Sequence, residues 1–361
     1  MAGSETPPQQ NRRGRAATVS DVARLAGVAK ATAARALGGY GAVSPAVLRR
    51  VETAAQALDY RPNELARSMT TGRSHTLGVV VGDIENPYFA MAVRGITDAA
   101  RRQGFNILLS NTSESVEFER DAVRVMLDRR VDGLVVAPAS STDIGHLQAV
   151  ADLGRPLVML DRRIPALAVD TVSVDNFGAA GQATRTLLAA GHRRIAFLSA
   201  TVPLAGSSDT DPVIGISSVT DRIGGFLAEL AAAGIVDGRR FIRLGAVDGA
   251  APDITRDLMA LPEPPTAIFT SDSLVALQVV RTLRSMSIAI PDAVSLVTFD
   301  DSDWTSIVSP ALTVVAQPIY DIGVEATRLL VARIEGAAGG EQDRVFPATL
   351  IERASVAPPT R

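Results

Sequence analysis

The sequence predicts a small all-α N-terminal unit followed by an α/β body made of two doubly wound, mostly parallel-sheet subdomains. Three observations predict this fold class. Three short helical patterns occupy the first 60 residues, and from His75 onward apolar β-rich runs alternate with stretches of helical period. The body has about 285 residues, which is too long for one typical doubly wound sheet.

The N-terminal helices have clear start and stop signals. Thr18 places a hydroxyl three residues before the carboxylate of Asp21, which is the pattern of a capping box. Gly27 ends the first helical pattern, and a second short helix is expected over Lys30–Leu37. Ser44 and Pro45 favour the start of a third helix that continues to about Leu58. Three short helices with a tight glycine turn between the first two are typical of a helix-turn-helix unit.

The sequence pattern of the body predicts a series of βαβ units. Because ligands of such folds bind at the carboxyl ends of the strands, polar residues directly after a strand are candidate contacts. The expected strands are Leu77–Val81, Phe105–Leu109, Gly133–Ala137, Leu157–Leu160, Ile195–Ser199, Phe241–Leu244, Ala267–Thr270 and Val294–Phe299.

Composition excludes several classes of protein. The chain is 47% hydrophobic and 21% charged, which is ordinary for a soluble globular protein. It has no cysteine, so disulfides, zinc–cysteine sites and thiol nucleophiles are excluded. Residues 1–15 are polar and unlike a secretory signal, and no apolar run approaches the length of a membrane span. We therefore expect a cytoplasmic protein without a membrane partner.

Charge is distributed unevenly along the chain. Residues 1–75 have a net charge of +6, and the remainder has a net charge of −9. Residues 1–16 are expected to form a disordered basic arm. This asymmetry suggests that the N-terminal part meets a polyanion, although a solvated basic face would have the same composition.

The second helix carries the side chains that suit nucleic acid. In a helix-turn-helix unit this helix enters the major groove. Lys30 and Arg35 can donate to guanine or to phosphate, and Thr32 can donate to phosphate. On the helices alone, solvated charges on a small helical bundle remain an equal alternative.

A series of motifs runs from residue 17 to the end of the chain. They are Thr18–Val28 with Thr32 and Arg35, Tyr60–Ser68, Thr76–Val81, Asn86–Phe89, Arg130–Leu134, Ala190–Ala196, Phe299–Asp301 and Leu312–Thr313. In this order and spacing the chain resembles the lactose-repressor (LacI/GalR) family of bacterial transcription regulators.

The resemblance implies a domain order and an assembly. A headpiece over 17–62 and a hinge helix with its linker over 63–74 would precede an effector-binding and dimerisation domain over 75–361, similar to periplasmic sugar-binding proteins. Its subdomains are expected at about 75–175 plus 306–338, and at 176–305 plus 339–361. The family acts as a homodimer on a near-palindromic, double-stranded DNA operator, by default as a repressor.

The resemblance also implies the residues that contact DNA. The hinge helix would open the minor groove at the centre of the operator. Met69 stands where the family usually has leucine, and the alternative is that Glu64–Met69 merely extends the headpiece. Ala29, Ala34 and Gly38 replace the family's usual serines and asparagine, so several phosphate contacts are missing. The expected DNA-binding residues are Thr18, Ser20, Lys30, Ala31, Thr32, Arg35, Asn63, Ala66, Arg67 and Met69.

The same comparison implies an effector pocket for a sugar or related polyol. Carboxylates accept paired hydroxyls, arginine donates in a bidentate manner, and aromatic faces cover a sugar ring. The alternative for each strand-end aspartate is a helix cap, above all for Asp272. The Val202–Ser218 loop suits either a lid or a surface excursion. The expected effector-binding residues are Tyr88, Phe89, Asp161, Arg222, Ser271, Asp272 and Asp300.

Two other functional classes compete with a regulator. An enzyme of sugar metabolism is disfavoured because the sequence has no phosphate-cradling loop, no dinucleotide fingerprint and no nucleophile elbow. A solute-binding protein is disfavoured by the basic headpiece. We expect no catalytic residues, no cofactor and no metal, and we leave open whether the effector releases DNA or promotes DNA binding.

Overall fold

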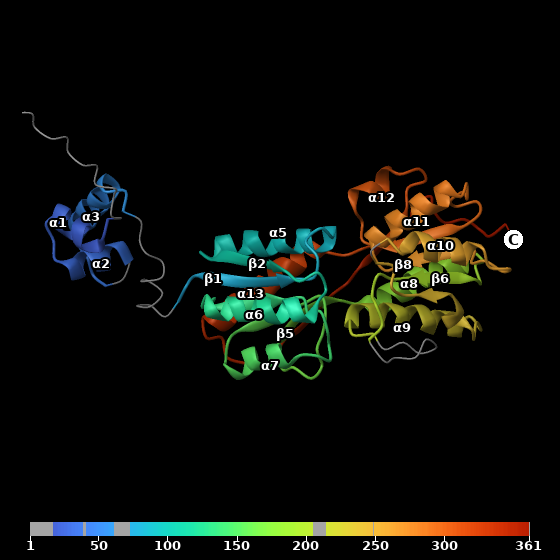
Figure 1. The fold of residues 1–361 in the computed structure, drawn as a ribbon, viewed down its shortest axis with the longest axis horizontal. Coiled ribbons are helices and arrows are strands. Elements are labelled where there is room, and N and C mark those ends of the chain that lie inside the picture. Colours follow the sequence, from blue (N-terminus) through green and yellow to red (C-terminus); the bar gives the residue numbers. More distant parts are fainter. Residues whose placement is uncertain (1–16, 39–40, 61–72, 205–213, 248, 361) are drawn as a thin grey trace, which may run out of the picture. The chain divides into compact units, whose positions relative to one another are not determined.

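The computed structural model describes residues 17–38, 41–60, 73–204, 214–247 and 249–360. The chain divides into two compact units, Met1–Ser74 and His75–Arg361 (Figure 1). The expected basic arm and most of the expected hinge helix lie outside the described residues. Within those described residues, no helix is both long enough and apolar enough to cross a membrane.

The first unit is a three-helix headpiece formed by α1 (Val19–Ala26), α2 (Lys30–Gly38) and α3 (Pro45–Ala57). The predicted capping box is present, because the Thr18 side chain accepts from the backbone of Asp21 while the Asp21 carboxylate accepts from the backbone of Thr18. Gly27 ends α1 in the left-handed conformation, with φ of 63°. The three helices begin and end close to where the sequence predicts.

The second unit contains two lobes. The first lobe is a six-stranded sheet flanked by helices. Three of its strands, Thr76–Val81, Gly133–Val136 and Leu157–Leu160, are almost continuously apolar and buried, as expected for parallel strands covered on both faces. Its elements are β1 (Thr76–Val81), α5 (Pro87–Arg102), β2 (Asn106–Asn111), α6 (Val116–Asp128), β3 (Gly133–Val136), α7 (Gly145–Asp152), β4 (Leu157–Leu160), β5 (Asp170–Val174), α13 (Ile319–Ile334) and β11 (Asp343–Phe346).

The second lobe repeats this plan. Figure 1 shows its sheet between α8 and α9 on one side and α10 and α11 on the other. Its elements are α8 (Asn176–Ala189), β6 (Ile195–Leu198), α9 (Ser217–Ala232), the short 3-10 helix Gly238–Phe241, β7 (Ile242–Arg243), α10 (Ala251–Met259), β8 (Ala267–Thr270), α11 (Ser273–Ser285), β9 (Ser295–Phe299), α12 (Asp303–Ile307), β10 (Thr313–Ala316) and β12 (Thr349–Ile351).

The two sheets have the same strand order. The first is β11-β5-β4-β3-β1-β2 and the second is β12-β10-β9-β8-β6-β7. All pairs are parallel except β10 with β12, which is antiparallel. The fold class predicted from the sequence is therefore confirmed, and each strand of the first lobe has a counterpart in the second.

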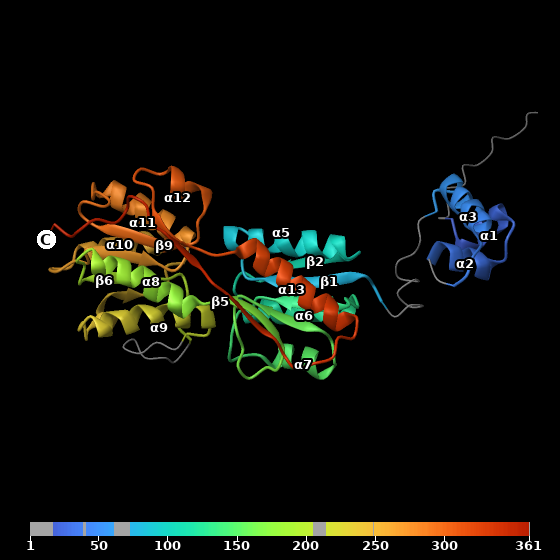
Figure 2. The ribbon, with the colours of Figure 1, turned by 180° about the vertical axis from the view of Figure 1, so that it is seen from behind.

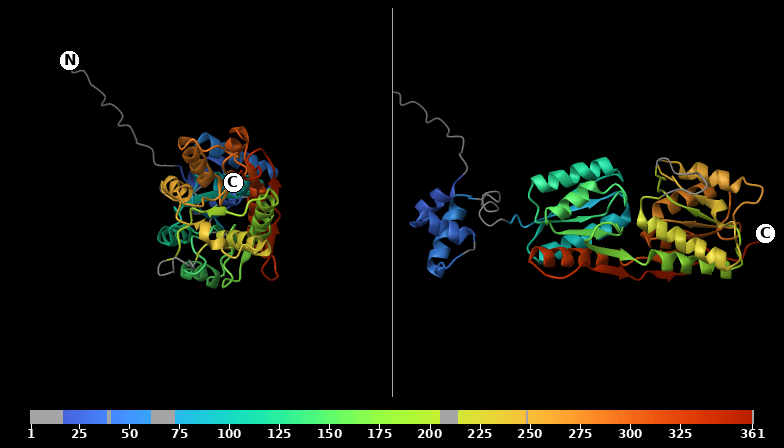
Figure 3. Two further views of the ribbon diagram at one scale, coloured as in Figure 1. Left: turned by 90° about the vertical axis from the view of Figure 1, so that its right-hand side faces the viewer. Right: turned by 90° about the horizontal axis from the view of Figure 1, so that it is seen from below.

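The first crossing between the lobes lies at the expected 175/176 boundary, between β5 and α8, but the two later crossings differ from those expected. We expected 306–338 in the first lobe, but β10 pairs with β9 and belongs to the second sheet. We expected 339–361 in the second lobe, but β11 pairs with β5 in the first sheet. Only α13 and β11 of this region belong to the first lobe, and the C-terminal segment then returns to the second (Figures 2 and 3). The sheet pairings decide this partition, and single-strand patterns do not reveal them.

Candidate functional site

The exposed face of α2 carries the side chains expected to read DNA. Lys30, Ala31 and Arg35 are exposed, and Thr32 is half-buried. Ala33 is fully buried in the headpiece core, so the opposite face of α2 holds the helix in place. The arrangement exposes Lys30 and Arg35 to a polyanion, with Ser20 also exposed on α1, while the Arg35 Nε donates to the carbonyl oxygen of Ala31 at 3.3 Å.

Thr18 and Arg50 shape the turn around α1. The Thr18 hydroxyl donates to the Asp21 carboxylate at 2.7 Å, so it already has a structural role at the start of the helix. Arg50 on α3 donates to the carbonyl oxygens of Ala26 and Gly27 at 2.5 and 3.1 Å. These two bonds satisfy acceptors at the end of α1 and fix the turn into α2. Sequence reasoning missed Arg50, because nothing local distinguishes it from a solvated arginine.

Four expected DNA contacts cannot be placed. Asn63, Ala66, Arg67 and Met69 lie outside the described residues, so their roles stay predictions.

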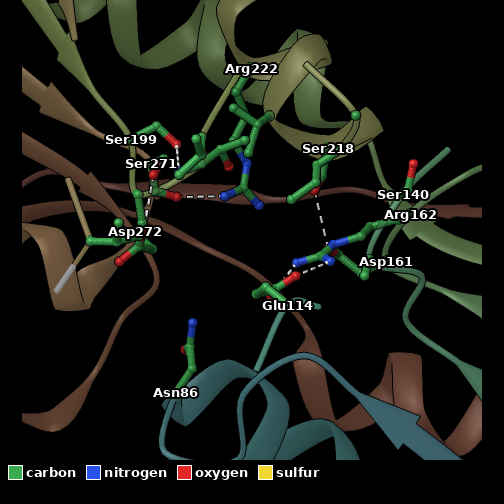
Figure 4. A pocket seen from close by; sticks show the side chains of 18 of the residues that line it. Asn86, Glu114, Ser140, Asp161, Arg162, Ser199, Ser218, Arg222, Ser271 and Asp272 are labelled. Carbon is green, nitrogen blue, oxygen red and sulfur yellow. Dashed lines mark hydrogen bonds and ion pairs between the residues drawn. The ribbon is translucent and has the colours of Figure 1, made fainter. Parts of the chain in front are cut away.

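The second unit contains a cavity of about 450 Å³ between its two lobes. It lies at the carboxyl ends of strands from both sheets, the place where ligands bind in open α/β folds (Figure 4). The structure brings all the expected effector residues into its wall: Tyr88, Phe89, Asp161, Arg222, Ser271, Asp272 and Asp300.

Tyr88 and Asp161 form the centre of the first lobe's wall. The Tyr88 hydroxyl donates to one Asp161 oxygen at 2.9 Å, and the Ser218 hydroxyl donates to the other at 3.2 Å. Burial, with the adjacent Asp161 carboxylate, raises the pKa of Tyr88 well above its usual range, so the phenol stays protonated and remains a donor. Phe89 packs edge-to-face on Tyr88 and gives this wall an apolar surface.

Beside Asp161, an ion pair that the sequence analysis missed, between the buried Arg162 and the more exposed Glu114, completes this wall. The Arg162 guanidinium donates to both Glu114 oxygens at 2.6 and 2.7 Å, and also to the carbonyl oxygen of Pro138 at 2.9 Å. Arg162 is only 7% exposed. Two signals were available, because Arg162 directly follows Asp161 and Glu114 follows β2 closely.

Arg222 is the main donor of the second lobe's wall. Its Nε donates to Asn176 at 2.7 Å and its Nη1 donates to the carbonyl oxygen of Ser271 at 2.5 Å. The guanidinium carbon lies 3.9 Å from the centre of the Phe299 ring, a cation–π arrangement. These contacts fix the orientation of Arg222 on one edge. Asn176 was not expected in this role.

Asp300 is a buried carboxylate with an unusual environment. Burial raises its pKa to about 6, although the nearby Arg222 charge and a 2.6 Å hydrogen bond from Gln317 act in the opposite direction. Asp300 has a φ of 71° and its counterpart Asp161 has a φ of 67°, both in the left-handed region. The same backbone conformation at equivalent strand ends points both carboxylates at the cavity from opposite lobes.

Asp272 confirms the structural alternative raised for it. One of its oxygens accepts from the backbone of Leu274 and Val275 at 3.0 and 2.9 Å, which caps the start of α11. Its other oxygen accepts from the Ser271 hydroxyl at 2.8 Å. Asp272 therefore lines the cavity while capping a helix.

The cavity can bind a small polar molecule through several neighbouring donors and acceptors. Among the described residues, no cluster of His, Asp and Glu has the composition of a metal site. The paired carboxylates, the fixed guanidinium and the Tyr88–Phe89 surface suit a ligand with several hydroxyl groups and an apolar face.

Both units of the chain match known protein families. Residues 18–63 match bacterial regulatory proteins of the lacI family, and residues 184–356 match a periplasmic binding protein-like domain. The transcriptional regulator PtxS of Pseudomonas aeruginosa is 34% identical over 99% of both chains. The repressor CytR of Escherichia coli is 31% identical over 94% of this chain and 96% of its own.

Solved structures match the fold over nearly the whole chain. The transcriptional regulator CelR in complex with cellobiose is 28% identical, with a TM-score of 0.68 over 94% of this chain and 99% of its own. The Lac repressor dimer bound to operator has a TM-score of 0.81 over 95% of this chain and 100% of its own, at 23% identity. With the headpiece, the two-lobed body and these relatives together, the chain belongs to the lacI family of bacterial regulatory proteins and is a DNA-binding transcription regulator with an effector-binding domain.

Proposed function

We propose that the protein is a repressor that binds a near-palindromic operator as a homodimer. We further propose that a sugar or related polyol bound in the cavity controls its affinity for DNA. The observation that carries the effector proposal is the gathering of Tyr88, Asp161, Arg222 and Asp300 in one buried cavity. We propose that the effector is bound without being chemically converted, in the cytoplasm where the chromosome lies.

Two solved relatives support a sugar as the effector. CelR was solved with cellobiose, and a regulator from Enterococcus faecium, which is 27% identical over 78% of this chain and 99% of its own, was solved with ribose. The volume of about 450 Å³ lies in the range of small-molecule pockets. The sugar hydroxyl groups would donate hydrogen bonds to Asp161 and Asp300, and Arg222 would donate hydrogen bonds to the sugar oxygens.

For DNA, we propose direct base contacts from Lys30 and Ala31, with Thr18, Ser20, Thr32 and Arg35 on phosphate. The exposure of Lys30 and Arg35 on one helix supports this assignment. We further propose that a hinge segment containing Asn63, Ala66, Arg67 and Met69 reaches the minor groove.

An exposed apolar strip supports a homodimer. Met91 on α5, Leu108 on the edge strand β2 and Phe118 on α6 are 48%, 36% and 56% exposed. These elements are neighbours at one edge of the first sheet. An open strand edge with apolar neighbours favours association with a second copy.

The direct test is DNA binding at fixed salt, with an operator-like palindrome compared with random duplex. Cellobiose, D-ribose and a set of polyols are added in turn. We expect selective binding to the palindrome and a shift in affinity with one compound. Equal affinity for both duplexes, unchanged by every compound, contradicts the proposal.

A further inference from the structure

Several hydrogen bonds between the lobes converge on the start of α9. The loop after β3 and the segment after β4 reach across from the first lobe. Ser141 donates its backbone N–H to the carbonyl oxygen of Gly215 at 2.7 Å, and Arg163 donates its backbone N–H to the Ser217 hydroxyl at 2.7 Å. Gly215 and Ser217 belong to the second lobe, so these bonds exist only while the lobes are close together.

An ion pair reinforces this junction. The Arg163 guanidinium donates to Asp221 on α9 at 2.5 Å. The side chain of Arg163 is 44% exposed and that of Asp221 is 27% exposed, so the pair lies at the rim and not in the effector cavity. Arg163 is anchored in its own lobe, because the next residue, Ile164, is buried in the core of that lobe.

We propose that Arg163 and Asp221 form a latch that holds the two lobes together and sets the balance between closed and open arrangements. This inference rests on the proposed control by a cavity ligand. Lobes of this kind open and close about a hinge, and a contact made in one arrangement shifts the population toward it. Arg163 is a positioning residue, because it acts on the lobes and does not line the cavity.

A second ion pair on the same helix provides a matched control. Arg185 on α8 pairs with Glu229 on α9, with side chains 57% and 23% exposed. Both pairs end on α9 and have similar exposure. The Arg163 pair joins two lobes, whereas the Arg185 pair lies within one lobe, so only the first depends on the lobe arrangement.

The test uses the full chain without any ligand. Because the protein has no cysteine, Leu153→Cys in the first lobe and Val236→Cys in the second introduce the only two labelling sites. The distribution of distances between spin labels at these sites reports the lobe arrangement. We expect Arg163→Ala to increase the open-to-closed ratio about threefold to fivefold, as expected for loss of a partly exposed pair. Arg185→Ala should leave the distribution unchanged.

A charge swap tests the pairing itself. Arg163→Asp alone should open the lobes, and Arg163→Asp with Asp221→Arg should restore the original distribution. An unchanged distribution in Arg163→Ala, or an equal shift in Arg185→Ala, overturns the latch.

Titration with cellobiose and D-ribose separates this proposal from the proposed function. A sugar that binds the closed arrangement should bind Arg163→Ala more weakly, by the factor by which the label distances show the closed fraction to fall. A fall in the closed fraction with no matching loss of sugar affinity overturns the link between the latch and the effector. If neither sugar nor any polyol binds, the effector assignment fails while the label distances still decide the latch.

Discussion

At the scale of single residues, the Asp300 carboxylate is costly to ionise because it is buried. Its pKa is raised to about 6 from the ordinary value of 3.8, so the folded protein holds the proton more tightly than the unfolded chain. The sign follows from linkage, since a raised acid pKa contributes stability at low pH that is lost as the pH rises through about 6.

Asp300→Asn should therefore stabilise the second unit above pH 7, because the amide carries no charge to bury. The difference from the unmodified protein should be on the order of 3 kcal/mol at pH 7.5 and should shrink toward zero near pH 4. Thermal unfolding across this pH range measures it, with the exposed Asp257→Asn as control. A gain that does not vary with pH contradicts the assignment. The same variant should bind the effector more weakly.

Lys30 is the residue whose loss should change sequence preference most. Lys30→Ala should lower the ratio of operator to random-DNA affinity about tenfold, since one good base contact discriminates by about 1–3 kcal/mol. Arg49→Ala removes the same charge from an exposed position on α3 and should weaken both duplexes alike. Parallel titrations at one salt concentration provide the comparison. Equal losses on both duplexes for Lys30→Ala contradict base reading.

At the scale of elements, close helix packing in the first lobe depends on two glycines. A Cβ atom on Gly323 of α13 would lie 2.2 Å from the carbonyl oxygen of Ala92 on α5, and one on Gly95 would lie 2.2 Å from the carbonyl oxygen of Tyr320. Both obstacles are backbone atoms, which cannot rotate away. The two helices must separate to accept any side chain at either position.

Gly323→Ala should therefore lower the free energy of unfolding by about 1–3 kcal/mol. Gly145→Ala at the start of α7 provides the control, because nothing lies within 4 Å of its added Cβ. Urea unfolding followed by far-ultraviolet circular dichroism reports on the helices of both lobes, whereas Trp304, the single tryptophan, lies on α12 of the second lobe. An unchanged midpoint for Gly323→Ala would show that α5 and α13 pack less closely than described.

The elements also show what the sequence could predict. The apolar runs at Leu77–Val81 and Ala267–Thr270 were correctly predicted as strands, and they form β1 and β8. In a βαβ series, a short continuous apolar run predicts a buried parallel strand. β11 was not predicted, since Asp343–Phe346 is a largely exposed edge strand with two charged residues. The two later lobe crossings were misplaced because they depend on long-range pairing of such strands.

The sequence predicted those cavity residues that directly follow a strand. Asp161 and Asp300 directly follow strands, and position alone marks them. Arg162 and Asn176 act through partners that lie 48 and 46 residues away in the sequence, Glu114 and Arg222. No local pattern encodes such pairs.

At the scale of the whole molecule, the exposed strip of Met91, Leu108 and Phe118 is the proposed homodimer surface. Leu108→Glu should weaken the dimer, because a charge on the edge strand would be buried against its partner copy. Val236→Glu places the same charge on the 98% exposed Val236 of the second lobe and should leave association unchanged. Sedimentation velocity over a range of concentrations measures the dimerisation of both variants. A Leu108→Glu protein that dimerises normally removes this surface from the proposal.

The proposed coupling between DNA binding and sugar binding must act equally in both directions. If a sugar changes operator affinity by some factor, operator DNA must change sugar affinity by the same factor, because both factors describe one thermodynamic cycle. We expect a factor of about 5–150, the usual range for allosteric coupling. Calorimetric titration of the sugar into free and operator-bound protein gives one factor, and operator titration with and without sugar gives the other. Asp300→Asn should weaken sugar binding in both states. A factor of one in both titrations would mean that sugar binding is not linked to DNA binding.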